Sequence, residues 1–156
     1  MALAAEFGIE DYPQPAGGCI LVERTYAERV RDAFRHLGRD AVDLDAFKLL
    51  QIGRHFRISE SVKVIVGRNR FENEALEGYA EGRVRLEPTL VMGPTALLEG
   101  DVDAEMLVLA ASLTARYCDS DQPVAFAIAG LEGISSIEAA PLERDDRRIA
   151  QWRIGD

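Results

Sequence analysis

The longest helix pattern in the chain, at residues 101–118, constrains the fold more than any other feature. Asp101 or Asp103 is suited to cap this helix. Apolar side chains recur at helical spacing and give the helix a broad apolar side, made by Met106, Leu107, Ala110, Ala111, Leu113, Thr114 and Tyr117. The apolar run PVAFAIA at 123–129 comes next and predicts a buried strand.

Shorter patterns alternate between helix and strand along the rest of the chain. Helices are predicted at 25–37, from Asp43 to Gly53, and at 70–80. Strands are predicted at 19–22, 54–58, 62–66, 83–87 and 148–154. Helices and strands interleave without a regular βαβ repeat. We therefore expect an α+β fold in a single domain, with helices packed on a mixed β-sheet.

The first 18 residues differ in character from the remainder of the chain. Residues 2–9 read as the last turns of a helix closed by Gly8, and 11–18 form a Pro/Gly-rich loop. So short a helix has little reason to begin a native protein, because its nucleation cost is poorly repaid. We expect 1–18 to be a linker or the end of a preceding domain, and 19–156 to form the domain.

Composition excludes several classes of protein. With 47% hydrophobic and 29% charged residues, the 156-residue chain is not disordered throughout, collagenous or a coiled coil. Two cysteines cannot form a disulfide framework or a cysteine-rich zinc site, although they could form one disulfide, and no metal spacing is visible. There is no signal peptide and no apolar run of about 20 residues, so we expect a cytoplasmic protein without a membrane partner.

Positive charge is concentrated in one window of an acidic chain. Six basic residues and one acidic residue between 48 and 70 give that window a charge of +5, whereas the whole chain carries −9. An acidic total argues against a general nucleic-acid binder, but a basic island is typical of a surface that binds a phosphate chain locally. The plain alternative is a set of solvated strand ends.

Within this window, rings and arginines alternate along a strand. Arg54, Phe56 and Ile58 are expected on one face, and His55 and Arg57 on the other. Rings beside arginines suit base stacking. The candidate RNA- or phosphate-binding residues are Lys48, Arg54, His55, Arg57, Lys63, Arg68, Asn69, Arg70 and Asn73.

The sequence GRN at 67–69 is a more specific signal. Asn69 is suited to cap the next helix, and the backbone N–H groups there, beside Arg68, predict an anion site. The alternative is a strand-to-helix turn with an asparagine cap and no ligand.

The two cysteines suggest different roles. Cys19 follows two glycines in PAGGC, which lets a ligand approach closely, so its thiolate is a candidate nucleophile or persulfide carrier. It can equally be a small buried residue that opens a strand. Cys118 ends a helix, where a thiolate is disfavoured, and we interpret it as structural. No P-loop, HExxH or GxSxG motif is present.

Three longer stretches resemble known families. YPQPAGGCILVERTYAERVRDAF, LLQIGRHFRI and VIVGRNRFENEAL resemble a subfamily of the tRNA 2-thiouridylases, which are PP-loop ATPases once named tRNA methyltransferases. The stretch LAASLTARYCD, which precedes an apolar strand, resembles the NFACT-R domain, an RNA-associated module of ribosome quality-control proteins.

The first resemblance implies that Cys19 accepts a persulfide and delivers sulfur to an adenylated uridine. The SGGxDS loop that binds ATP in those enzymes is missing, so this chain would hold no cofactor and ATP would bind a separate N-terminal domain. The implied partners are tRNA or another structured RNA, that PP-loop domain in cis or in trans, and a sulfur donor. The chain alone would not be a complete enzyme.

The sequence supports two functional hypotheses. The first is an RNA-engaging C-terminal domain of a tRNA-thiolation protein. The alternative is a non-catalytic module, either an NFACT-R-like domain that binds RNA or the ribosome or a structural dimerisation domain.

Overall fold

A computed structural model of the chain describes residues 20–155. The helical end predicted at 2–9, the loop predicted at 11–18 and Cys19 all lie outside the described residues. No helix within 20–155 has the length and apolar character needed to span a bilayer.

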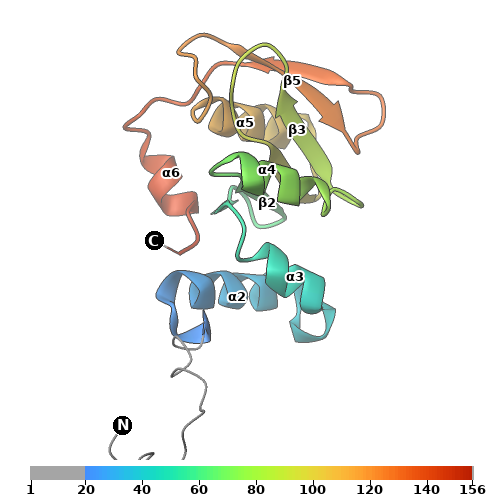
Figure 1. Cartoon of the computed structure of the whole chain (residues 1–156), viewed down its shortest axis with the longest axis vertical. Helices are drawn as coiled ribbons and strands as arrows, with labels where there is room; N and C mark the ends of the chain where they lie inside the picture. Colours follow the sequence, from blue (N-terminus) through green and yellow to red (C-terminus); the bar gives the residue numbers. More distant parts are fainter. Residues whose placement is uncertain (1–19, 156) are drawn as a thin grey trace, which may run out of the picture.

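The described part of the chain is built around one six-stranded sheet (Figure 1). The strands are β1 (Arg54–Arg57), β2 (Val62–Val66), β3 (Val84–Pro88), β4 (Ala96–Gly100), β5 (Val124–Ala129) and β6 (Ser136–Ala139). Their spatial order is β1-β2-β4-β3-β5-β6, and each of these pairings is antiparallel. The predicted α+β class is confirmed, with an antiparallel sheet in place of a mixed one.

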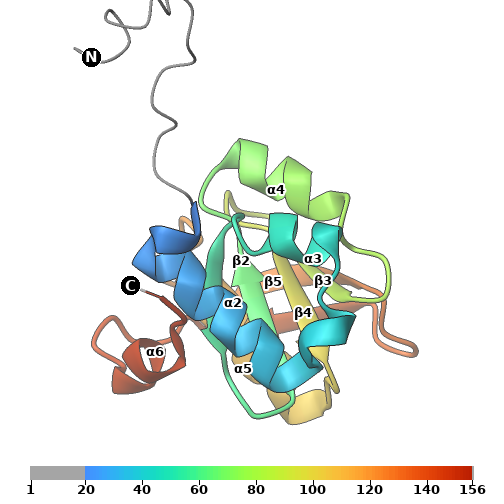
Figure 2. The same cartoon turned by 90° about the horizontal axis from the view of Figure 1, so that it is seen from below.

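Helices cover both faces of the sheet. Figure 2 shows α2 (Arg24–Leu37), α3 (Leu44–Leu49) and α4 (Arg70–Glu77) on one side and α5 (Ala104–Ala115) behind. Two short 3-10 helices, η1 (Ile20–Val22) and η2 (Arg39–Ala41), flank α2, and α6 (Arg147–Trp152) precedes the end of the chain.

Strand β2 takes part in both layers of the core because successive side chains point to opposite faces. Val62, Val64 and Val66 belong to the cluster that contains α5. Ile65 packs in the opposite layer, with side chains from α3, α4 and β4. This burial on both faces explains why VKVIV is nearly free of polar residues.

The strand predicted at 148–154 is wrong, because this segment forms α6. The Asp146 carboxylate accepts the Arg148 N–H at 2.9 Å and so caps a helix there. Only a single bridge between Phe56 and Arg153 remains of the predicted strand. The strand predicted at 19–22 is also wrong over its described part, because Ile20–Val22 is a 3-10 helix.

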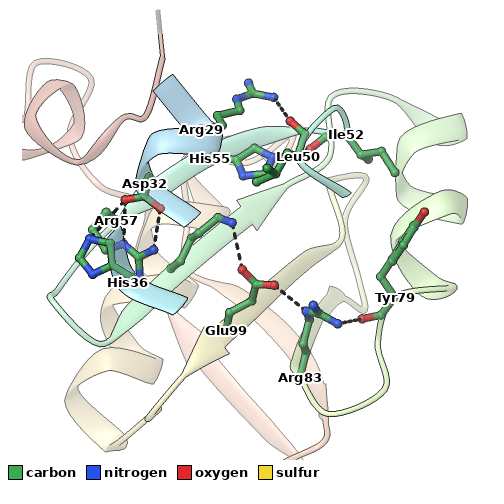
Figure 3. Close-up of polar contacts among 11 residues, drawn as sticks. Arg29, Asp32, His36, Leu50, Ile52, His55, Arg57, Tyr79, Arg83 and Glu99 are labelled. Carbon is green, nitrogen blue, oxygen red and sulfur yellow. Dashed lines mark hydrogen bonds and ion pairs between the residues drawn. The ribbon is translucent and has the colours of Figure 1, made fainter. Parts of the chain in front are cut away.

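A buried ion-pair network crosses the sheet on the side of α2 (Figure 3). Lys63 and Glu99 are direct register partners on β2 and β4, and Lys63 Nζ lies 3.0 Å from a Glu99 oxygen. Arg83 contacts the other Glu99 oxygen at 2.8 Å. Burial alone would raise the pKa of Glu99, but the charges of Lys63 and Arg83 outweigh it and lower that pKa.

We expect Glu99→Leu to lower the free energy of unfolding by about 3–5 kcal/mol, because it leaves the Lys63 ammonium buried without a partner. The Lys63 side chain is only 4% exposed, so water cannot replace the carboxylate. Urea denaturation measures the loss. The double variant Lys63→Met/Glu99→Leu removes both charges and should recover most of the stability; equal stability of Glu99→Leu and wild type contradicts the assignment.

Candidate nucleic-acid interface

A cleft of about 380 Å³ lies where β2 passes into α4. It is lined by Arg54 at the start of β1, by the loop 67–70, and by residues 92–94, with Asn73, Tyr117 and Asp119. Five of the predicted site residues meet here: Arg54, Arg68, Asn69, Arg70 and Asn73. We call this site the VGRN cleft, after residues 66–69.

The VGRN sequence builds the turn and one wall of this cleft. Asn69 caps α4, since its side-chain oxygen accepts the Glu72 N–H at 3.0 Å. Asn73 reaches across to the opposite wall, accepting the Thr95 N–H at 3.2 Å and donating to the Gly93 carbonyl at 3.4 Å. A Cβ at position 67 would overlap the Asn73 amide oxygen, so any larger residue there must displace the Asn73 side chain. The Asn-capped turn is therefore present, and a solvent-accessible cleft adjoins it.

Glu72 occupies part of the anion site that the sequence predicts at the start of α4. Its carboxylate accepts the Arg68 backbone N–H at 2.8 Å and also binds the Arg68 guanidinium. Burial would raise the pKa of Glu72, but these bonds and one from the Gly53 backbone outweigh it, so the pKa is lowered. An incoming anion would meet an Arg68 side chain already held in place.

Two further arginines and a ring border the cleft. The Arg54 guanidinium lies 4.8 Å from the centre of the Tyr117 ring and donates to the Gly67 carbonyl at 3.3 Å. The Arg70 side chain is 88% exposed and pairs with Glu74 at 2.7 Å. Met92, 78% exposed, lies on the opposite wall. The cleft thus combines cations with an aromatic ring, which is the chemistry of a phosphate-and-base site.

Four predicted site residues lie elsewhere. Lys48 is exposed on α3 and pairs with Asp45 at 2.9 Å. Arg57 pairs with Asp32 of α2, and Lys63 is buried against Glu99. His55 is 0% exposed. Lys63 is 3% exposed. Because the side chains of His55 and Lys63 are buried inside the domain, neither can contact an RNA bound at the surface, which corrects their assignment as RNA-binding residues.

Sequence reasoning did not single out Tyr117 as a functional residue. It placed Tyr117 on the apolar side of the helix at 101–118, but α5 ends at Ala115. Beyond this end the ring contacts both Phe56, at 6.2 Å between ring centres, and Arg54. The only signal in the sequence is its place in ARYCD, next to an arginine.

His55 is held neutral inside the domain (Figure 3). Its Nε2 donates to the Ile52 carbonyl at 2.8 Å, which leaves Nδ1 as an acceptor without a partner among the described residues. Burial, with smaller effects of the Lys63 and Arg29 charges, sets the pKa of His55 well below its ordinary value.

This depressed pKa makes stability depend on pH. Below about pH 6.5 the unfolded chain binds a proton at His55 that the folded protein does not, so the folded state should lose about 1.4 kcal/mol per pH unit from this residue as pH falls. Denaturation of wild type and His55→Gln between pH 7.5 and pH 5 measures the difference. Parallel pH profiles for the two proteins would contradict this.

We expect Gly67→Ala to destabilise the protein by about 1–3 kcal/mol, because the new methyl displaces the Asn73 amide from Thr95 and Gly93. In an Asn73→Ala background the same change should cost much less. Thermal denaturation of the four proteins in this double-mutant cycle gives the coupling. Additive effects would show that Asn73 is not what restricts position 67.

Of the two cysteines, only Cys118 lies in the described part of the chain. Cys19 lies outside it, so its predicted role as nucleophile or persulfide carrier stays a prediction. Burial and the neighbouring Asp119 raise the pKa of Cys118 to about 11, which keeps this thiol protonated, in keeping with a structural role. Within residues 20–155 no group of three or more His, Cys, Asp or Glu side chains is placed to hold a metal.

The fold and the cleft define a small α+β module with a cationic, ring-bordered site, and comparison with known proteins identifies its class. The family described as "NFACT protein RNA binding domain" matches residues 53–153. The chain belongs to this family, and RNA is the partner that the family supports. The matched segment contains both arginine motifs and Tyr117. The predicted resemblance to NFACT-R is confirmed.

A solved structure shares the fold. The C-terminal part of the fibronectin/fibrinogen-binding protein from Streptococcus suis matches 83% of this chain with a TM-score of 0.54 and 14% sequence identity. This chain spans 61% of the length of that solved chain. No curated protein matches significantly. None of these comparisons supports the thiouridylase resemblance, so they favour the alternative hypothesis of a binding module.

Proposed function

We propose that this domain binds structured RNA, with tRNA as the first RNA to test, through the VGRN cleft. Arg54, Arg68 and Arg70 contact phosphates there, and Tyr117 fixes Arg54 at the edge of the site. The described residues act by binding and perform no chemistry in this proposal.

The observation that carries the proposal is the convergence of two separate motifs. GRHFR contributes Arg54, and VGRN with the next residue contributes Arg68 and Arg70. These three cations line one cleft on a chain whose net charge is −9. An acidic body repels polyanions in general, so attraction is confined to the place where cations gather.

The ion pairs within the site are compatible with phosphate binding. Arg70 and its partner Glu74 are both largely exposed, so their pair contributes little and a phosphate can replace the carboxylate. Arg68 is more tightly held, because Glu72 binds both its guanidinium and its backbone N–H. Arg68 therefore presents its remaining donors in a fixed direction, which favours recognition of a defined phosphate geometry.

Asp119 limits what the cleft accepts. Its side chain lines the same site as the three arginines and is exposed. A carboxylate beside a phosphate is repulsive, so the backbone of an RNA strand should follow the arginine side of the cleft and avoid the Asp119 side. Asp119 therefore restricts the path that an RNA strand can take through the VGRN cleft.

We expect the double variant Arg68→Gln/Arg70→Gln to bind tRNA about tenfold more weakly than wild type at about 50 mM salt, because two phosphate contacts are lost. The slope of log affinity against log salt should fall in magnitude by about 1.4–1.8. Titration of the full chain with tRNA at about 50 and 200 mM salt measures both quantities.

The matched control is Arg39→Gln/Arg144→Gln. Both arginines are exposed and neither lines the VGRN cleft, so this variant changes net charge equally. It should retain the affinity and salt slope of wild type. Equal weakening by the two double variants would mean that total charge, and not the cleft, governs binding. Absence of any tRNA binding by wild type at the lower salt concentration would exclude the proposal and favour the dimerisation alternative.

A further inference from the structure

We infer that a second RNA contact lies at the other end of β1, in the cleft between α2 and the end of the chain. This inference rests on the proposed function, since it assigns to the same RNA a further part of its path. The ligand is the phosphodiester backbone and an unpaired base of the RNA held in the VGRN cleft.

The two clefts are placed at opposite ends of one strand. Arg54, the first residue of β1, lines the VGRN cleft, and Arg57, its last residue, lines the second cleft. Three residues of extended strand separate their Cα atoms by about 10 Å. Their side chains point to opposite faces of the sheet, Arg54 toward Tyr117 and Arg57 toward Asp32 of α2, so an RNA strand that reaches both clefts passes around the edge strand β1. The second cleft has a volume of about 390 Å³, and its walls are α2 on one side and residues 151–155 on the other. Figure 1 shows α6 above α2, with the chain that follows α6 running down toward α2.

Two cations of this second cleft are not neutralised by the described part of the chain. Arg31 and Arg35 are exposed, one helical turn apart on α2, and line the cleft together. Neither forms an ion pair with another described residue, whereas two acids on the same helix, Asp32 and Glu28, are paired with other arginines. The Asp32 carboxylate binds Arg57, with one contact at 2.6 Å, and Glu28 binds Arg24 at 2.9 Å.

Glu60 is the one acid of the cleft that has no ion-pair partner within residues 20–155, and it is exposed. His36 lies 3.5 Å from Asp32 and so belongs to the Asp32–Arg57 group at the base of the cleft. The two guanidinium groups of Arg31 and Arg35 therefore outnumber this single carboxylate, which leaves an excess of positive charge. A phosphate backbone that runs along α2 satisfies both arginines.

The cleft also holds an aromatic ring. Trp152 at the end of α6 is half-buried and lines it, and the Arg148 guanidinium lies 5.2 Å from the centre of the ring. A ring beside arginines is suited to stacking an unpaired base. Because Trp152 is the only tryptophan of the chain, its fluorescence reports on this cleft alone.

The test uses the full chain, tRNA and three double variants in which two arginines become glutamines. Arg31→Gln/Arg35→Gln alters the second cleft, Arg68→Gln/Arg70→Gln alters the VGRN cleft, and Arg39→Gln/Arg144→Gln alters neither. Affinity, salt slope and Trp152 emission are measured for each protein. Unchanged emission in the absence of RNA checks that the variants keep the fold around Trp152.

We expect tRNA to quench or shift Trp152 emission in wild type. Arg31→Gln/Arg35→Gln should weaken binding about five- to tenfold and lower the salt slope by about 1.4–1.8, as for two lost phosphate contacts. The change in Trp152 emission at saturating tRNA should also be reduced, because the RNA is then held by the VGRN cleft alone.

The outcomes separate this inference from the proposed function. The second contact is overturned if Arg31→Gln/Arg35→Gln binds tRNA with wild-type affinity and tRNA leaves Trp152 emission unchanged. If Arg68→Gln/Arg70→Gln weakens binding in the same experiment, the proposed role of the VGRN cleft is still supported. If instead only Arg31→Gln/Arg35→Gln weakens binding and tRNA changes Trp152 emission, the second contact is supported and the proposed role of the VGRN cleft is overturned. If neither variant differs from the control, both are overturned.

Discussion

The burial of β2 on both faces is the constraint on which the rest of the structure depends. Its valines pack in the layer that contains α5, and Ile65 packs with α3 and α4. Lys63, on the second face, can be buried only because Glu99 lies directly opposite in the register of β4. The end of this fixed strand sets the position of Gly67, and through Gly67 the loop and wall of the VGRN cleft.

Apolar runs and helix-capping residues, which are read from short stretches of sequence, allowed much of the fold to be predicted. VKVIV is a buried strand, and Asn69 and Asp103 cap α4 and α5 as expected from their position before apolar periodic segments. The strand predicted at 148–154 is wrong because Asp146 caps a helix. Strands β4 and β6 were not predicted, since ALLEG and SIEA are short and gain their strand conformation from neighbours distant in sequence.

The parts of the candidate site that depend on neighbouring residues in the sequence could be predicted, and the parts that depend on distant residues could not. Arg68 and Asn69 lie in one short motif, so their proximity was visible in the sequence, and strand alternation placed Arg54 away from His55. The burial of Lys63 depends on Glu99, which is 36 residues away, and the position of Tyr117 beside Arg54 depends on where α5 ends. Non-local contacts of this kind leave no periodic signal in a single sequence.

The course of residues 153–154 along β1 has a consequence for the solution behaviour of the domain. An unpaired edge strand offers its N–H and C=O groups to any other extended chain, and this is a common route to aggregation. Here Arg153 forms an isolated β-bridge with Phe56, and the Ile154 N–H donates to the His55 carbonyl at 2.9 Å. The end of the chain therefore covers part of the edge strand β1. The other edge strand of the sheet is β6, which is only four residues long and carries the exposed Glu138. Both borders of the sheet thus discourage intermolecular strand pairing.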